Sequence, residues 1–304
     1  MDILGSVLYD TIYHSAPIIL CVLGGIFAYK ANVLNIALEG MMLNGAFVSV
    51  LVVYFTGNVF LGILLAILST LFLGLIFSFL GITCKGNVII VGLAINLLML
   101  AIVGFALVLM GTSNISLTNI NVADFKINIP IIEDIPLLGK ILSGHTPITY
   151  ISFIGIFVMW VLMYKTKFGV YVRVVGENED AAKSIGLKTN RYKYIAVLIG
   201  AFTCALAGAN LSMERLALFT NDMTAGRGFI AIAAIYCGRG SPVLSSMYAI
   251  LFGLARALSI NLSIYAGPAA GLFDTIPYFI MVAVLAVVSV IKYKNYKVRG
   301  FKNE

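Results

Sequence analysis

Charge is scarce in this sequence. Charged residues make up 11% of the 304 residues, whereas a soluble domain carries about 25%. Apolar residues make up 61%, and the mean hydropathy is +1.03. No stretch that is charged or rich in Ser and Pro is long enough to fold separately. We therefore expect one all-α polytopic membrane domain over residues 1–304, because helices satisfy their own backbone hydrogen bonds in lipid.

Catalytic motifs are missing as well. The sequence has no GxxxxGK(S/T) loop to cradle the phosphates of ATP, and no HExxH or GxSxG motif. No His lies near a Ser or Asp pair that could serve as a general base. These absences argue against a membrane-embedded enzyme. Any energy for work across a membrane must come from a partner protein or an ion gradient.

Cysteine is rare, and its distribution suggests no special chemistry. Cys21, Cys84, Cys204 and Cys237 lie singly in apolar runs, with no CxxC pair and no nearby His. We expect them to be small buried hydrophobic residues. The sequence therefore predicts neither a metal site nor another cofactor.

Basic residues outnumber acidic ones, 20 to 13, and gather in two segments. These are the loop 165–193 and the tail 292–304, whereas the loop 112–146 is slightly acidic. Such a distribution is the positive-inside pattern of membrane proteins, not a nucleic-acid-binding surface. It predicts a cytoplasmic loop at 165–193, a cytoplasmic C-terminal tail and an external loop at 112–146. This external loop could be a small structured cap, a contact for an external partner, or a spacer.

Runs of about 20 apolar residues predict the membrane-spanning helices. The predicted spans are 8–28, 33–55, 59–82, 87–110, 147–164, 194–213, 219–238, 243–262 and 275–291. If all nine cross, the N-terminus lies outside. A re-entrant or broken segment at 33–55 would reverse that, so nine and ten passes both remain open.

Two apolar runs are interrupted by Gly, Asn and charge at corresponding positions of the two halves. The first, Asn35–Gly45, contains Glu39, the one formal charge between Lys30 and Lys85; the second is Asn221–Gly238. Paired interruptions in transporters predict a site near the bilayer midplane, formed by broken helices. Their free N–H and C=O groups can bond a polar solute. Ordinary helix packing by small residues is the alternative.

The candidate substrate-pathway residues are polar, flexible or aromatic positions in or near these segments. They are Asn35, Glu39, Gly40, Asn44, Asn96, Asp222, Gly226, Gly228 and Phe229. Glu39 needs a protein partner or a watery cavity, because a bare charge at membrane depth costs at least roughly 2.5–3.5 kcal/mol. Phe229 and Tyr236 could stack on a base, although core packing is the simpler role for both.

Other polar residues in the spans are expected to link helices. They are Asn96, Asn210, Arg256 and Asn261. Among them, Arg256 costs the most free energy to place at membrane depth, because it is charged. We expect it to face protein, water or the interface, with Asp274 and Glu39 as candidate neighbours.

The loop 165–193 contains a candidate coupling helix. Acidic residues precede a run of good helix formers that Gly186 ends, which predicts a short amphipathic helix over 176–187 on the cytoplasmic surface. The pattern Asp180-Ala181-Ala182-x-x-x-Gly186 resembles the EAA loop by which ATP-binding cassette permeases dock on their ATPase subunits, although the proline that often follows is missing. The candidate coupling residues are Glu179, Asp180, Ala181, Ala182 and Gly186.

A longer resemblance covers nearly the whole chain. The stretch from Asn35 to Ala46, Asn-Ile-Ala-Leu-Glu-Gly-Met-Met-Leu-Asn-Gly-Ala, is similar to a signature of permeases in the branched-chain amino acid and simple-sugar importer superfamily. The segments 176–186, 201–209 and 225–242 extend the match in the same order. Within that superfamily the chain most resembles the shorter of the two permeases of bacterial nucleoside importers. Ala37 in place of the usual glycine, and Arg256 in place of a neutral polar residue, leave the substrate open.

The resemblance implies a set of partners. They are a second, longer permease, a cytoplasmic ABC ATPase and an external substrate-binding lipoprotein, assembled in the bilayer of the bacterial cytoplasmic membrane. The implied role is half of a nucleoside translocation pathway. Simple sugars and branched-chain amino acids are alternative substrates, and a proton-coupled secondary transporter that uses Glu39 or Asp222 is an alternative mechanism.

Overall fold

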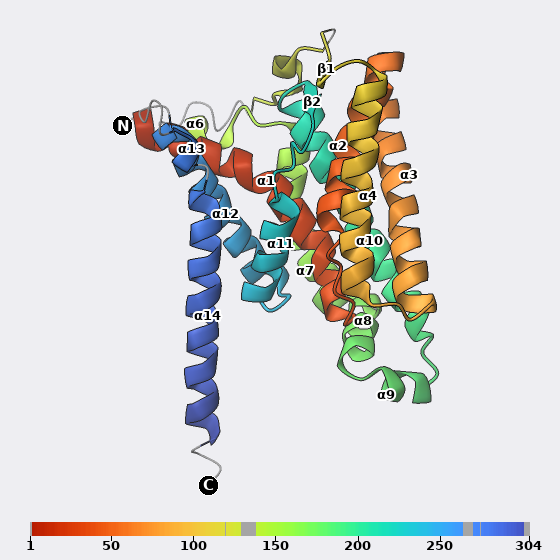
Figure 1. Cartoon of the computed structure of the whole chain (residues 1–304). Coiled ribbons are helices and arrows are strands. Elements are labelled where there is room, and N and C mark those ends of the chain that lie inside the picture. Colours follow the sequence, from red (N-terminus) through yellow and green to blue (C-terminus); the bar gives the residue numbers. More distant parts are fainter. Residues whose placement is uncertain (1, 119, 129–137, 264–269, 274, 301–304) are drawn as a thin grey trace.

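The computed structural model describes residues 2–118, 120–128, 138–263, 270–273 and 275–300, and it is dominated by helix (Figure 1). In these residues, eight helical segments are long and apolar enough to cross a membrane. They match eight of the nine predicted spans, with ends that differ by a few residues, and the all-α polytopic membrane fold is confirmed. The spans are built from α1 (Asp2–Lys30), α2 (Leu38–Thr56), α3 (Val59–Ser78) with the π-helical turn η1 (Phe79–Thr83), α4 (Val88–Leu109), α7 (Pro147–Lys165), α10 (Thr189–Ala209) with the π-helical turn η3 (Asn210–Glu214), α12 (Pro242–Ser263), and α14 (Ile276–Gly300) after the short α13 (Ala270–Phe273).

The ninth predicted span, 219–238, is not a continuous helix. The segment starts in strand β2 (Leu218–Thr220), passes through turns, and becomes helical only at α11 (Arg227–Cys237). Three turn positions with positive φ, Asp222 at 53°, Ala225 at 44° and Gly226 at 72°, keep the chain out of a helix before α11. The 11 residues of α11 rise about 16 Å, roughly half of the hydrocarbon core. The prediction of a full-length helix here is wrong, and the expected break in this segment is present.

The other break lies between α1 and α2. Asn32 adopts a left-handed conformation with φ of 57°, and the chain stays non-helical until α2 begins at Leu38. Most of this connection is buried, including Val33 and Asn35. The predicted span 33–55 therefore begins five residues too early, because its first residues form an irregular entry into α2.

The core consists of α1, α2 and α10, which bury most of their side chains. Small residues allow α10 to lie directly against α2: a Cβ at Gly208 would come within 2.3 Å of the Met42 carbonyl oxygen and 2.4 Å of the Ala46 nitrogen. Such close backbone approach is typical of helix packing in membranes. The helices α3, α4 and α14 flank this core and expose many large apolar side chains, as lipid-facing helices do.

The two ends of the molecule carry different elements. The N-terminus, the strands and α6 (Leu138–Leu142) lie at one end, whereas α8 (Lys167–Glu177), α9 (Glu179–Ser184) and the C-terminus lie at the other (Figure 1). In the described chain, the start of α1 and the end of α14 thus lie at opposite ends, as they would after an odd number of crossings, and the segment from β2 through α11 covers part of the length of a ninth. Residues 292–300 of the expected basic tail continue α14, and 301–304 lie outside the described residues.

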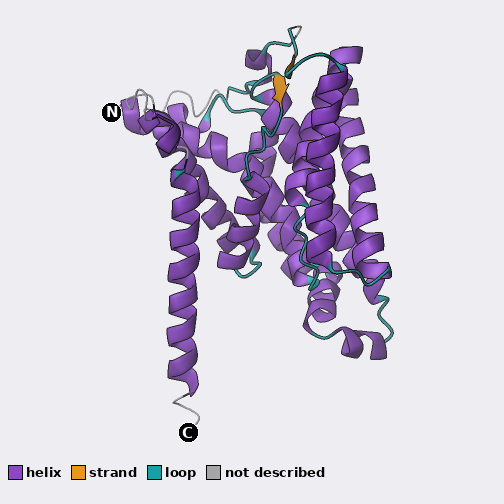
Figure 2. Cartoon of the chain, viewed as in Figure 1, coloured by secondary structure: helices purple, strands orange, loops and turns teal. Residues whose placement is uncertain are grey.

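The expected external loop 112–146 contains folded pieces in its described part. Strand β1 (Asn114–Ser116) pairs antiparallel with β2, with Ile115 opposite Phe219 (Figure 2). A 3-10 turn, η2 (Val122–Phe125), follows. Since β2 directly precedes the second break, this pairing joins the external loop to the entry of α11.

Candidate functional site

The carboxyl group of Glu39 joins the two breaks. Its two oxygens accept hydrogen bonds from the backbone nitrogens of Gly226, at 2.9 Å, and Gly228, at 2.5 Å. These nitrogens belong to the first turn of α11, so a side chain on the first turn of α2 caps the start of another helix. Unpaired N–H groups and the positive end of the helix dipole both favour a carboxylate there. Glu39 is only 8% exposed. The sequence predicted that its carboxylate needs a protein partner or a watery cavity, and the two backbone N–H groups are that protein partner.

The N-terminus of α2 is held in turn by Asn96 of α4. The Asn96 side-chain oxygen accepts from the Gly40 nitrogen at 2.8 Å, and its amide donates to the Ile36 carbonyl oxygen at 3.0 Å. Asn35 stabilises the same entry, because its side-chain oxygen accepts from the Ala37 nitrogen at 3.0 Å. The break is therefore fixed by side-chain hydrogen bonds from two separate elements.

The remaining asparagines link helices. Asn44 donates from α2 to the hydroxyls of Ser69 at 2.8 Å and Thr70 at 2.9 Å on α3. Asn261 donates from α12 to Asp10 of α1 at 2.9 Å. These contacts agree with the expectation of interhelical bonds for Asn261, and they place Asn44, a candidate pathway residue, between helices.

A face of polar and aromatic side chains remains exposed beside the second break. Asp222 and Phe229 are exposed, Phe229 by 42% of its surface. Tyr278 of α14 is exposed as well, and its hydroxyl donates to the carbonyl oxygen of Ala225, just before α11, at 2.7 Å. Tyr236, at the far end of α11, is also exposed and packs edge-on against Tyr29. We name Asp222, Phe229, Tyr236 and Tyr278 the α11 face.

The chain alone encloses little space at this position. A cavity of about 20 Å³ lies beside α11, bordered by Arg227, Phe252, Arg256 and Tyr278 among others. That volume is roughly enough for one water molecule. Arg256 is thus beside Arg227 at this cavity, and Asp274, its other expected neighbour, lies outside the described residues.

The coupling segment forms two helices instead of the single helix predicted over 176–187. Helix α8 ends at Glu177, and Asn178 caps α9 by accepting from the Ala181 nitrogen at 2.9 Å. Gly186 ends the segment with a φ of 84°. The prediction was too long by several residues, because Asn178 competes for the backbone N–H groups and starts a new helix there.

Glu179 fixes α9 against the start of α10. Its carboxylate accepts from Lys193 and pairs with Lys183 at 2.9 Å. The hydrogen bond from Lys193, followed by that from Lys183, lowers the pKa of Glu179 to about 2. Glu179 is therefore ionised throughout the physiological pH range, and its contribution to holding α9 is lost only as the pH falls from about 4.5 toward 2.

The candidate coupling residues face in different directions. Ala182 is fully buried, whereas Asp180 and Ala181 are exposed. Ile185, which the sequence reasoning did not select, is 70% exposed at the tip of the segment. A large apolar side chain exposed beside a short helix is the kind of anchor that a partner protein buries.

Replacing Gly186 with valine is expected to uncouple transport from ATP hydrolysis. A β-branched residue is a genuine outlier at a φ of 84°, and the strain of roughly 1–2 kcal/mol would displace the end of α9. A displacement that costs about 1 kcal/mol should lower the transport rate by about fivefold or more. Gly186→Asn should lower it less, because asparagine tolerates this conformation. Uptake and ATPase rates of reconstituted complexes measure this; full coupling in Gly186→Val would show that the turn is not needed.

A buried polar cluster between the first half of α1, the start of α7 and the end of α10 was missed by the sequence reasoning. Asn210 donates to Glu214 at 2.8 Å and to Thr146 at 3.1 Å. The Arg215 guanidinium lies 3.3 Å from the centre of the Tyr13 ring. Adjacent residues of opposite charge after an apolar run were the available signal. The contacts confirm Asn210 as an interhelical link, here within the polar cluster.

The chain was compared with known proteins. Residues 7–285 match the family described as branched-chain amino acid transport system / permease component. The chain belongs to this family. It is therefore a membrane permease subunit, a transport component without an ATPase site of its own.

Three relatives cover most of this permease. The guanosine ABC transporter permease protein NupQ of Bacillus subtilis is 34% identical over 91% of this chain and 87% of its own length. The nucleoside ABC transporter permease protein NupC of Lactococcus lactis is 30% identical over 86% and 84%. TsgC13 of Haloferax volcanii, whose name assigns it provisionally to glucose transport, is 30% identical over 94% and 92%.

Proposed function

We propose that this permease forms one half of the translocation pathway of an ATP-driven nucleoside importer. The observation that carries the proposal is the meeting of the two broken segments at Glu39, beside the exposed α11 face. Discontinuous helices near the membrane midplane are the usual place for substrate sites in transporters. Because the chain encloses only about 20 Å³ there, a second permease supplies the opposite wall.

The proposed partners follow from the two ends of the molecule. Loop 165–193 is rich in Lys and Arg, so α8, α9 and the C-terminus are assigned to the cytoplasm. There α9 and the exposed Ile185 meet the ABC ATPase. The opposite end, with the β1–β2 pair, faces outward and receives substrate from a binding lipoprotein. The membrane in question is the bacterial cytoplasmic membrane.

Nucleosides are the proposed substrate class for two reasons. The α11 face presents the aromatic rings of Phe229 and Tyr278, on which a base can stack. Two relatives also carry nucleosides or guanosine in their names. Simple sugars are the second candidate, because TsgC13 is named for glucose.

The test is uptake by proteoliposomes that contain this chain, its companion permease, the ATPase and the lipoprotein. Labelled uridine and guanosine are supplied with and without ATP, and ribose, glucose or leucine is added as competitor. The proposal predicts ATP-dependent nucleoside uptake that none of the three competitors inhibits. Inhibition by ribose or glucose would assign the pathway to sugars, and inhibition by leucine would assign it to amino acids.

The same vesicles test the mechanism. Uptake by this chain alone that collapses when the proton gradient is dissipated would replace the importer with a secondary transporter. In that case Glu39 and Asp222 would be the carboxylates to replace first.

A further inference from the structure

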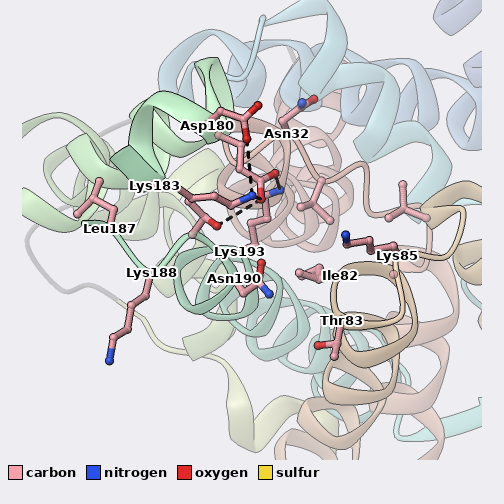
Figure 3. A pocket seen from close by; sticks show the side chains of 15 residues that line it. Asn32, Ile82, Thr83, Lys85, Asp180, Lys183, Leu187, Lys188, Asn190 and Lys193 are labelled. Atoms are coloured by element: carbon pink, nitrogen blue, oxygen red, sulfur yellow. Dashed lines mark hydrogen bonds and ion pairs between the residues drawn. The ribbon is translucent and has the colours of Figure 1, made fainter. Parts of the chain in front are cut away.

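A polar cavity of about 820 Å³ opens at the end of the molecule that carries α9 (Figure 3). Its walls are the ends of four membrane spans and the coupling segment. They include Asn32 and Val33 after α1, Gly81 to Thr83 in η1 after α3, Val88 at the start of α4, Thr189, Asn190 and Lys193 at the start of α10, and Glu179, Asp180 and Lys183 of α9. Since spans end where the hydrocarbon ends, the cavity lies at the level of the lipid headgroups.

The cavity carries positive charge. Four lysines and two acidic residues line it, which leaves an excess of two positive charges. Glu179 is already shared by Lys183 and Lys193. The Lys85 side chain points into the cavity, and Lys85 makes no ion pair within the described part of the chain, whereas Lys188 points away from it (Figure 3). Lys85 is therefore the cation available to an anion in this space.

The backbone at Lys85 is unusual. Lys85 has a φ of 55° and follows the π-helical turn η1, where the Gly86 nitrogen donates to the Leu80 carbonyl oxygen at 3.0 Å. Glycine is the residue expected at such a helix end, because a side chain there is strained. Strained residues cluster at ligand sites, so a lysine in this conformation beside a cavity supports a role for its ammonium group.

We infer that this cavity binds the headgroup of an anionic phospholipid from the cytoplasmic leaflet, with Lys85 contacting the phosphate. Asn190 and Thr83 line the same space and can donate hydrogen bonds to the phosphate and glycerol oxygens. Apolar side chains next to the lining residues face outward, including Leu80, Ile89 and Ile90, the last 65% exposed. They provide a surface for the acyl chains, which a soluble phosphate ester would not use. Anionic lipids are attracted to basic clusters at this membrane face.

The test measures lipid retention by the full-length chain in mixed micelles, with phosphatidylglycerol, neutral phosphatidylcholine and soluble glycerol phosphate as probes. We expect the wild-type chain to retain phosphatidylglycerol over phosphatidylcholine, and Lys85→Gln to lower the affinity by about fivefold. Lys188→Gln removes the same charge at the cavity mouth and should retain the lipid as the wild type does. Equal retention by wild type and Lys85→Gln would overturn the inference. Competition by glycerol phosphate as strong as that by the lipid would also overturn it, because the site would then bind a soluble anion.

A second variant separates binding from folding. Lys85→Gly removes the charge but relieves the strain at φ of 55°, so its melting temperature should equal or exceed that of the wild type while lipid retention falls. A Lys85→Gly chain that retains the lipid fully would contradict the proposal. Since these readouts require neither transport nor ATP, they stand apart from the test of the nucleoside importer.

Discussion

Nucleoside uptake is expected to fall by about tenfold or more when Glu39 is replaced by alanine, because two backbone N–H groups lose their charged acceptor, and each such hydrogen bond contributes roughly 1.5–3 kcal/mol. These are the groups of Gly226 and Gly228, which start α11. Without the carboxylate, α11 has no fixed position against α2, and the α11 face that we assign to the substrate pathway is displaced. Uptake into vesicles and the amount of assembled complex are measured together.

Assembly should survive the Glu39→Ala substitution. The contacts between α1, α2 and α10 rest on small residues such as Gly208 and Ala205, none of which touches the Glu39 carboxyl group. Glu39→Gln keeps one acceptor oxygen and should lie between wild type and alanine. Asp124→Asn, an exposed change in the turn η2, is the matched control and should have no effect. Normal uptake by Glu39→Ala would remove Glu39 from the pathway, and failed assembly would make it a residue of the core fold.

The length and position of the spans could be predicted because hydropathy is a local property. Eight spans end within a few residues of the predicted positions, since each needs only a sufficient apolar run. The exception, 219–238, is apolar only in its second part; its first part pairs with β1 from a distant loop and then turns at Asp222. A contact between residues about a hundred positions apart leaves no signal in one sequence.

The candidate site was predicted in part. The interruptions at Asn35–Gly45 and Asn221–Gly238 indicated that two segments matter together, and they do meet. The partner of Glu39 could not be predicted, because it is a pair of backbone N–H groups that every residue except proline has. In the coupling segment, the buried position of Ala182 depends on how α9 packs against the ends of the spans, which the helix pattern alone does not contain.

Gly228→Ala should be as damaging to uptake as Glu39→Ala, although it adds one methyl group instead of removing a carboxyl group. The new Cβ would lie 2.5 Å from the Glu39 nitrogen and 2.6 Å from its Cα, and backbone atoms cannot move aside as a flexible side chain can. Relief of this clash requires α11 to move away from α2, at a cost of about 1–3 kcal/mol or more. Gly104→Ala on α4, where no atom lies within 4 Å, is the matched control and should transport normally.

The double variant Glu39→Ala with Gly228→Ala tests whether both changes act through one contact. If the α2–α11 contact is what uptake requires, either single change already removes it, and the second change should add little. The uptake loss of the double variant should therefore equal that of the worse single variant. Losses that multiply would show that Glu39 and Gly228 serve separate functions, and that the meeting of the two breaks is not the unit on which transport depends.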